Sequence, residues 1–131
     1  MTILGLDGKT YNWTMRHRRP TNSSELHRQI KSLLLELFPV DPILEEVSLP
    51  GCGRHTLYAD FYLPHRKLMI ECQGRQHYEY VPHFHVNKVE FAMSRVRDKL
   101  KSQWCDTNGI TLVKLSYESA IDEWTRQIIE I

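Results

Sequence analysis

Two carboxylates stand in apolar segments of this chain, at positions where apolar side chains would pack better. Asp60 and Glu71 each lie in a short apolar run, and only a tight turn at residues 64–66 separates the two runs. An ionised carboxylate among apolar neighbours is costly unless a positive charge pairs with it. Two such acids, opposed across a hairpin, indicate a site for a divalent cation.

The chemistry of such a pair follows from its oxygens. If Asp60 lies across from Glu71, their carboxylates and a backbone carbonyl, that of Cys72, would hold one Mg²⁺ (or Mn²⁺) ion, because hard cations prefer oxygen ligands. Such an ion polarises a phosphate and activates water for attack on phosphorus. Spacing alone leaves a second interpretation open, in which both acids lie on a solvent-facing sheet surface and pair with Arg66 or Arg75.

The elements around the hairpin predict an α/β fold. In chain order we expect a helix at 22–38, strands at 43–49, 56–63 and 67–73, a helix at 86–107, a strand at 110–115 and a final helix at 119–131. The first helix would start with a capping box, in which Asn22 caps and Glu25 follows three residues later. The crossover through the long helix predicts that the strand near 110 joins the sheet parallel to an earlier strand.

Residues 1–20 are expected to form a small hairpin, turning at Asp7-Gly8, and a basic arm; residues 21–131 would form the core domain. On the long helix, an apolar stripe should cover the sheet. Its members are Val89, Met93, Val96, Leu100 and Trp104.

Composition bounds the class of protein. A chain of 131 residues with net charge +1 fits one globular domain. Its three cysteines form no CxxC pair, which favours a reducing, cytoplasmic setting over secretion. The sequence has no apolar run long enough to span a membrane and no signal-peptide pattern.

The α-β-β-β-α-β order, with Asp60 at one strand end and Glu-x-Gln in the next strand, resembles the PD-(D/E)XK nuclease superfamily over residues 22–117. Gln73 stands where the family motif has Lys, and Ala59 stands where the motif name has Pro. The resemblance implies a single-domain, restriction-endonuclease-like core: a mixed sheet flanked by helices, here with a small N-terminal hairpin.

Residues 73–78, 97–101 and 104–112 are similar to one branch of that superfamily, the phage and intron-associated homing endonucleases related to very short patch repair endonucleases. The branch motif runs Glu, Asp, a variable residue, His and Asp. The resemblance implies a Mg²⁺-dependent DNA endonuclease in a bacterial or phage-infected cell. It places catalytic roles on Glu25, Asp60, Glu71, Gln73, His77 and Asp98.

Each of these roles has an ordinary alternative. His77 would exchange protons with water and the leaving oxygen, or would be hydrogen-bonded at a strand end. Gln73 carries no charge and would position groups by hydrogen bonds. Glu25 is also the expected capping-box residue, and Asp98 would otherwise form an exposed ion pair with a neighbouring arginine.

Basic and aromatic residues in the cluster at 16–19 and in the loop at 75–88 suggest contact with DNA, because cations neutralise phosphates and aromatic rings stack on bases. The alternatives are a solvent-exposed loop at 75–88 and a solvated basic turn at 16–19. The spacing of His83 and His85 fits no recognised zinc ligand set. Expected nucleic-acid contacts are Arg16, Arg18, Arg19, Arg75, Tyr78 and Lys88.

Two rival functions stay open. The chain would be a DNA-binding or assembly module that kept the fold without cleavage, which the Gln73 departure favours, or a nuclease for structured RNA. A chain of this length has little room for a separate recognition domain. Specificity would therefore need a homodimer, a partner protein or the N-terminal arm.

Overall fold

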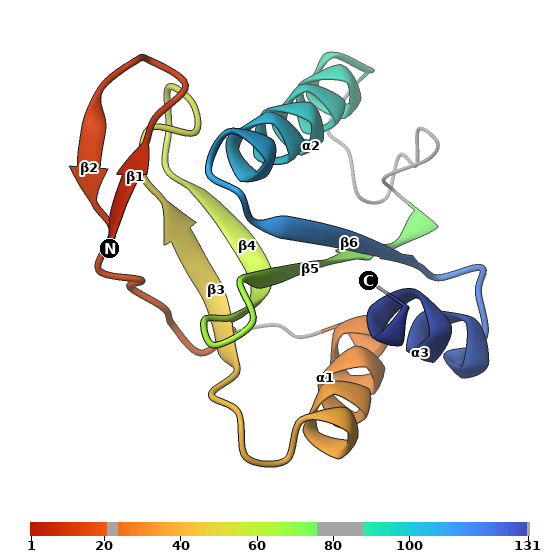
Figure 1. The fold of residues 1–131 in the computed structure, drawn as a ribbon. Coiled ribbons are helices and arrows are strands. Elements are labelled where there is room, and N and C mark those ends of the chain that lie inside the picture. Colours follow the sequence, from red (N-terminus) through yellow and green to blue (C-terminus); the bar gives the residue numbers. More distant parts are fainter. Residues whose placement is uncertain (21–23, 76–87, 131) are drawn as a thin grey trace.

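The computed structural model describes residues 1–20, 24–75 and 88–130, and its elements follow the predicted order (Figure 1). The elements are β1 (Thr2–Leu4), β2 (Thr10–Asn12), α1 (Glu25–Leu37), β3 (Leu44–Leu49), β4 (Leu57–Leu63), β5 (Leu68–Gln73), α2 (Lys88–Thr107), β6 (Thr111–Ser116) and α3 (Ile121–Ile129). The expected α/β class is confirmed. None of the helices in these ranges combines the length and apolar character needed to cross a membrane.

The central sheet has four strands in the order β3-β4-β5-β6. β3, β4 and β5 pair antiparallel, whereas β5 and β6 pair parallel, as the crossover through α2 predicts. α2 covers one face, and α1 and α3 cover the other (Figure 1). The sheet is therefore mixed, and each of its faces has a hydrophobic core.

The β1–β2 hairpin shares the core beneath α2. Trp13, which directly follows β2, is 2% exposed; its indole packs on Tyr62 and Trp104 and donates a hydrogen bond to the carbonyl of Ser48 (2.9 Å). Residues 1–13 are thus fixed to the sheet by a buried aromatic contact.

α1 begins differently from the prediction. Ser24 is the N-cap, and its side chain accepts a hydrogen bond from the backbone N–H of His27 (3.1 Å). Glu25 is the first helical residue, and its carboxylate pairs with Arg28 (2.9 Å). The predicted capping box is therefore wrong: the chain has two possible caps two residues apart, and Ser24 takes that role. Asn22 lies outside the described residues.

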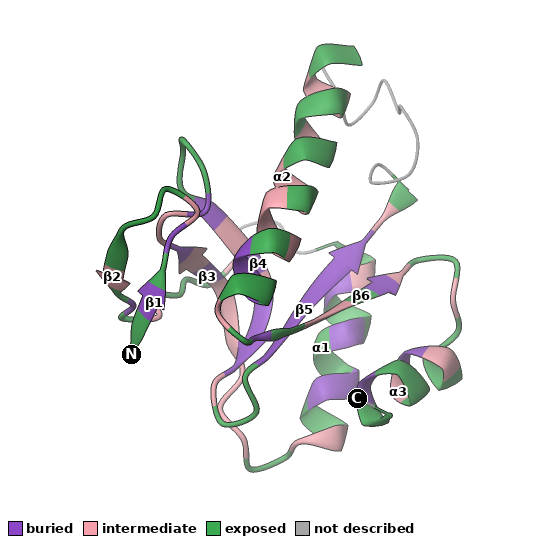
Figure 2. Cartoon of the chain, turned by 45° about the horizontal axis from the view of Figure 1, so that its top comes forward, coloured by how far each residue is buried: buried purple, intermediate pink, exposed green. Residues whose placement is uncertain are grey.

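The predicted apolar stripe of α2 packs only near the C-terminal end of the helix. Trp104 is fully buried and Leu100 is partly buried, but Val89, Met93 and Val96 are 70%, 47% and 46% exposed. A helix of 20 residues is about 30 Å long, whereas a strand of six residues spans about 20 Å. The first turns of α2 consequently extend past the sheet (Figure 2).

Candidate active site

A local reversal in β3 and β4 positions the first acid. Ala59 packs in the core beneath α2, yet Phe61, two residues later, packs in the core of α1 and α3. Residues two apart on a regular strand share a face, so the strand turns over at Asp60. Glu46, which lies opposite Asp60 in the register, has a left-handed φ of 48°. The reversal therefore falls at the residue that carries the first acid.

The two carboxylates meet where β4 and β5 separate. The regular pairing of these strands ends at Phe61 and Ile70. At the next residues, the backbone N–H of Asp60 donates to Glu71 Oε2 (2.8 Å), and the N–H of Cys72 donates to Asp60 Oδ2 (2.8 Å). The side chains thus accept the hydrogen bonds that carbonyls would otherwise accept, and the predicted pairing of Asp60 with Glu71 is present.

Glu71 is buried, so the solvent-facing interpretation is wrong for this residue. It is 2% exposed, because it points from the centre of the sheet toward α2. Its partner is neither Arg66 nor Arg75: Arg66 binds Asp41 (2.8 Å), and Lys101 of α2 places its Nζ 2.7 Å from Glu71 Oε1. Glu71 therefore pairs with the lysine of the helix that covers its strand.

Sequence reasoning missed Lys101. It lies three residues before Trp104 and therefore on the same side of α2, where a lysine can bury its stem against the sheet. Its side chain is 16% exposed. Burial disfavours the ammonium, but the charges of Glu71 and Asp60 outweigh that effect and raise the pKa of Lys101. The ammonium stays charged beside the two acids.

The acid pair, when fully ionised, carries more negative charge than Lys101 neutralises. Burial, followed by the neighbouring charge of Glu71, raises the pKa of Asp60 well above its usual range, against the effects of the Cys72 N–H and Lys101. Once both acids are ionised, two carboxylates beside one ammonium leave one negative charge uncompensated, and a divalent cation that displaces the proton of Asp60 would balance it. No cluster of three or more Asp, Glu, His or Cys ligands occurs within the described ranges, and water would complete the coordination shell.

Cys72 would contribute only its backbone to such a site. Its side chain packs in the opposite core, with α1 and α3, and is 8% exposed. Burial raises the pKa of this thiol, which keeps it neutral. The carbonyl of Cys72 is the group that a hard cation would use.

Gln73 lies at the end of β5, two residues beyond Glu71, and is 5% exposed. Its Nε2 is buried without a hydrogen-bond partner among the residues that the structure describes. Leaving a buried donor unsatisfied costs about 1–3 kcal/mol. Within the described ranges, no group accepts a hydrogen bond from this amide, so it is free to donate to a bound ligand.

The remaining predicted catalytic residues lie in different settings. Glu25 is 70% exposed at the start of α1 and pairs with Arg28. Asp98 is partly buried on α2, one turn before Lys101, and its charge helps to raise the pKa of that lysine. His77, with Tyr78, His83 and His85, lies outside the described residues.

The predicted nucleic-acid contacts are all exposed where the structure describes them. Arg18 pairs with Glu46 (2.8 Å) and lies over the ring of Tyr58 at 4.0 Å. The other exposed contacts are Arg16, Arg19, Arg75 and Lys88.

The chain is similar to parts of several viral proteins. It is 43% identical over 65 residues to the uncharacterized protein 307L of Invertebrate iridescent virus 6, a match that covers 50% of this chain and 33% of that protein. The uncharacterized protein 094L of Frog virus 3 is 37% identical over 82 residues, or 61% of this chain and 52% of the relative. The chain thus spans a third to a half of the length of these relatives. No described protein family and no solved structure matches it.

Proposed function

We propose that this chain is a metal-dependent nuclease that hydrolyses phosphodiester bonds of DNA. The observation that carries the proposal is the meeting of Asp60, Glu71 and Lys101 where β4 and β5 separate. Surface carboxylates need no such arrangement. A buried acid pair with a raised pKa, beside one lysine, suits a site that binds a cation and an anionic substrate.

Asp60 and Glu71, with the carbonyl of Cys72, would hold Mg²⁺ or Mn²⁺. When bound, such an ion supplies Lewis-acid stabilisation of the phosphate and lowers the pKa of a water molecule. Lys101 fixes one oxygen of Glu71 and places a positive charge beside the reacting phosphate. Lys101 of α2 would thus supply the ammonium group that the superfamily motif places on the strand, at the position of Gln73 in this chain.

Gln73 would orient the substrate. Its unsatisfied amide N–H donors are buried at the strand end next to the acids, where a phosphate oxygen or the attacking water would accept them. Held in this way, the attacking and leaving oxygens stay in line across phosphorus. His77 stays a predicted acid–base group, and Asp98 a positioning residue through Lys101.

A plasmid assay tests this function. Purified protein is incubated with supercoiled DNA and Mg²⁺ or Mn²⁺, beside Asp60→Asn and the control Lys99→Met, whose lysine is exposed on the same helix. We expect nicking by wild type and by the control, and a loss of at least about 100-fold in Asp60→Asn, because removing one electrostatic group costs about 10²–10³ in rate.

Three results would overturn the proposal. If wild type cuts no DNA with either ion while binding it unchanged in EDTA, the chain is a binding module whose acids merely close the end of the strand ladder. If it cuts structured RNA and no DNA, the substrate class is wrong. Cleavage retained in Asp60→Asn would show that the activity lies elsewhere.

A further inference from the structure

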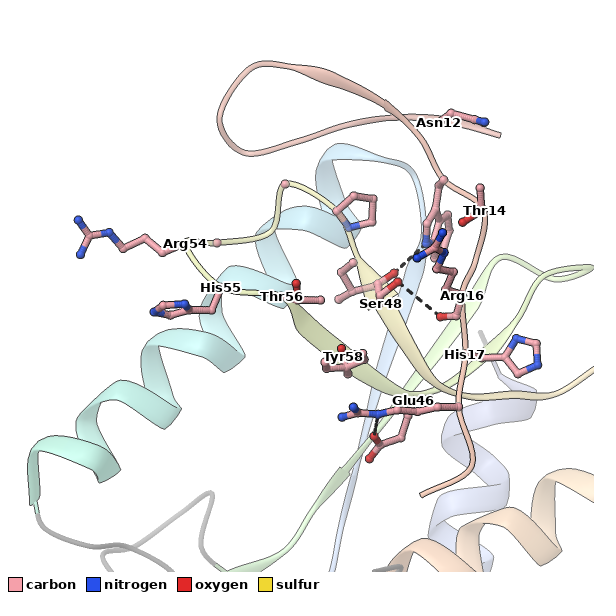
Figure 3. A pocket seen from close by; sticks show the side chains of 16 residues that line it. Asn12, Thr14, Arg16, His17, Glu46, Ser48, Arg54, His55, Thr56 and Tyr58 are labelled. Carbon is pink, nitrogen blue, oxygen red and sulfur yellow. Dashed lines mark hydrogen bonds and ion pairs between the residues drawn. The ribbon is translucent and has the colours of Figure 1, made fainter. Parts of the chain in front are cut away.

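A groove of about 500 Å³ opens between residues 12–18, which run from the end of β2 into the basic arm, and the loop at 50–56, which follows β3. Figure 3 shows Arg16 and His17 on one side of it and Arg54 and His55 on the other, with Ser48 and Tyr58 between them. We propose that this groove binds the phosphate backbone of a nucleic acid. The inference rests on the proposed function and gives its substrate a path to the site.

The charges of the groove favour an anion. Glu46 is the one acidic residue among those that line it, and its carboxylate is bound to Arg18 at 2.8 Å. No carboxylate within the described ranges forms an ion pair with Arg16 or Arg54. In Figure 3 the side chains of His17, Arg54 and His55 extend outward from the rim. Two guanidinium groups without a carboxylate partner and two imidazoles thus flank the groove, a charge pattern that phosphates complement.

Backbone hydrogen bonds fix the basic arm to the sheet. Its backbone lies along β3, an edge strand: the N–H of Arg18 donates to the carbonyl of Glu45 (3.2 Å), and the N–H of Ser48 donates to the carbonyl of Arg16 (2.9 Å). Arg18 is held over the ring of Tyr58 by its bond to Glu46. A solvated turn would lack these contacts. An arm fixed to the sheet loses less conformational entropy when a ligand binds.

Two residues that line the groove lie close to elements that carry the candidate active site. Tyr58 precedes Asp60 by two residues on β4, which is about 7 Å along the strand. On the other wall, Gly53 lies so close to α2 that a Cβ there would be 3.4 Å from Leu100, the neighbour of Lys101. A phosphodiester chain in the groove would therefore lie beside the strand that carries Asp60.

Binding without cleavage tests the groove. The full chain carrying Asp60→Asn is titrated against a fluorescein-labelled 30-base-pair DNA in EDTA, and the salt dependence of Kd is measured. Arg16→Gln and Arg54→Gln are compared with Arg126→Gln, an exposed arginine on α3 that pairs with Glu123. We expect each groove variant to weaken binding by about 3- to 10-fold and to lower the slope of log K against log salt by about 1, whereas Arg126→Gln changes neither.

Each further result has one meaning. If the double variant Arg16→Gln/Arg54→Gln binds as Arg126→Gln does, the groove assignment is wrong. It is also wrong if polyglutamate displaces the DNA at equal charge concentration, because the groove would then select acidic peptides. If the arginines govern DNA binding but wild type cuts nothing with Mg²⁺ or Mn²⁺, the groove assignment is supported and the proposed nuclease function is refuted.

Discussion

Replacing Lys101 with methionine removes the cation of a buried pair and keeps the packing of its stem. Glu71 is 3% exposed and Lys101 16% exposed, so the remaining carboxylate would stay buried beside Asp60 without a counter-charge. Removing one partner of a buried pair costs about 3–5 kcal/mol. Because Lys101 keeps some contact with solvent, we expect the lower end, about 3 kcal/mol at pH 8.

Urea denaturation in EDTA measures this loss. With a slope of about 1.5 kcal/mol per molar urea, the midpoint should fall by about 2 M. The loss should be smaller at pH 5, because the raised pKa of Asp60 lets the acid pair take up a proton in place of the ammonium. Lys99→Met makes the same change in charge at an exposed position and should cost less than about 0.5 kcal/mol. Equal midpoints for the two variants would refute the assignment of Lys101 to a buried ion pair.

Three other changes probe the same region. The pKa of Asp60 is higher in the folded than in the unfolded state, so its favourable contribution to the free energy of unfolding is complete below about pH 4 and is lost as pH rises through the folded pKa. In EDTA, Asp60→Asn should therefore gain stability relative to wild type between pH 4 and pH 8. Parallel curves of stability against pH for the two proteins would contradict this. Gln73→Met removes an unsatisfied buried donor, so the free energy of unfolding should stay equal or rise by about 1 kcal/mol. Plasmid cleavage should fall at least about 10-fold. A large loss of stability would mean that the amide has a partner in the protein. Lys67→Gly relieves a left-handed φ of 48° in the β4–β5 turn and should stabilise the protein by about 0.5 kcal/mol. A non-glycine residue in this conformation costs about 1–2 kcal/mol, and the greater loss of backbone entropy by glycine on folding offsets about 0.5–1 kcal/mol of that gain. A lowered Tm in thermal unfolding would contradict the prediction.

Local patterns in the sequence were sufficient for the order of elements and for the meeting of Asp60 and Glu71. A tight turn places its flanking strands antiparallel, and a crossover helix makes the next strand parallel. The acids could therefore be placed opposite one another before the register was known. The N-cap of α1 and the exposure of the first turns of α2 could not be predicted, because the first depends on which of two caps is used and the second on how far the sheet extends beneath the helix.

Lys101 and the groove escaped prediction for a different reason. A lysine on an amphipathic helix usually lies in solvent, and only the position of α2 over β5 turns it toward Glu71. Arg54 is likewise about forty residues from Arg16 in the chain, and the backbone bonds between the arm and β3 bring the two walls together. The reversal at Asp60 and Glu46 has no sequence signal, since neither residue is a glycine.

Calorimetric titration of Mn²⁺ into the protein is the most direct test of the carboxylate pair as a metal site. Wild type and Lys99→Met should bind one ion per chain and release protons on binding, because an ion held by both carboxylates displaces the proton that burial and Glu71 favour on Asp60. Asp60→Asn should bind at least about 10-fold more weakly and without proton release. Equal binding by wild type and Asp60→Asn, or no binding by wild type, would contradict the account.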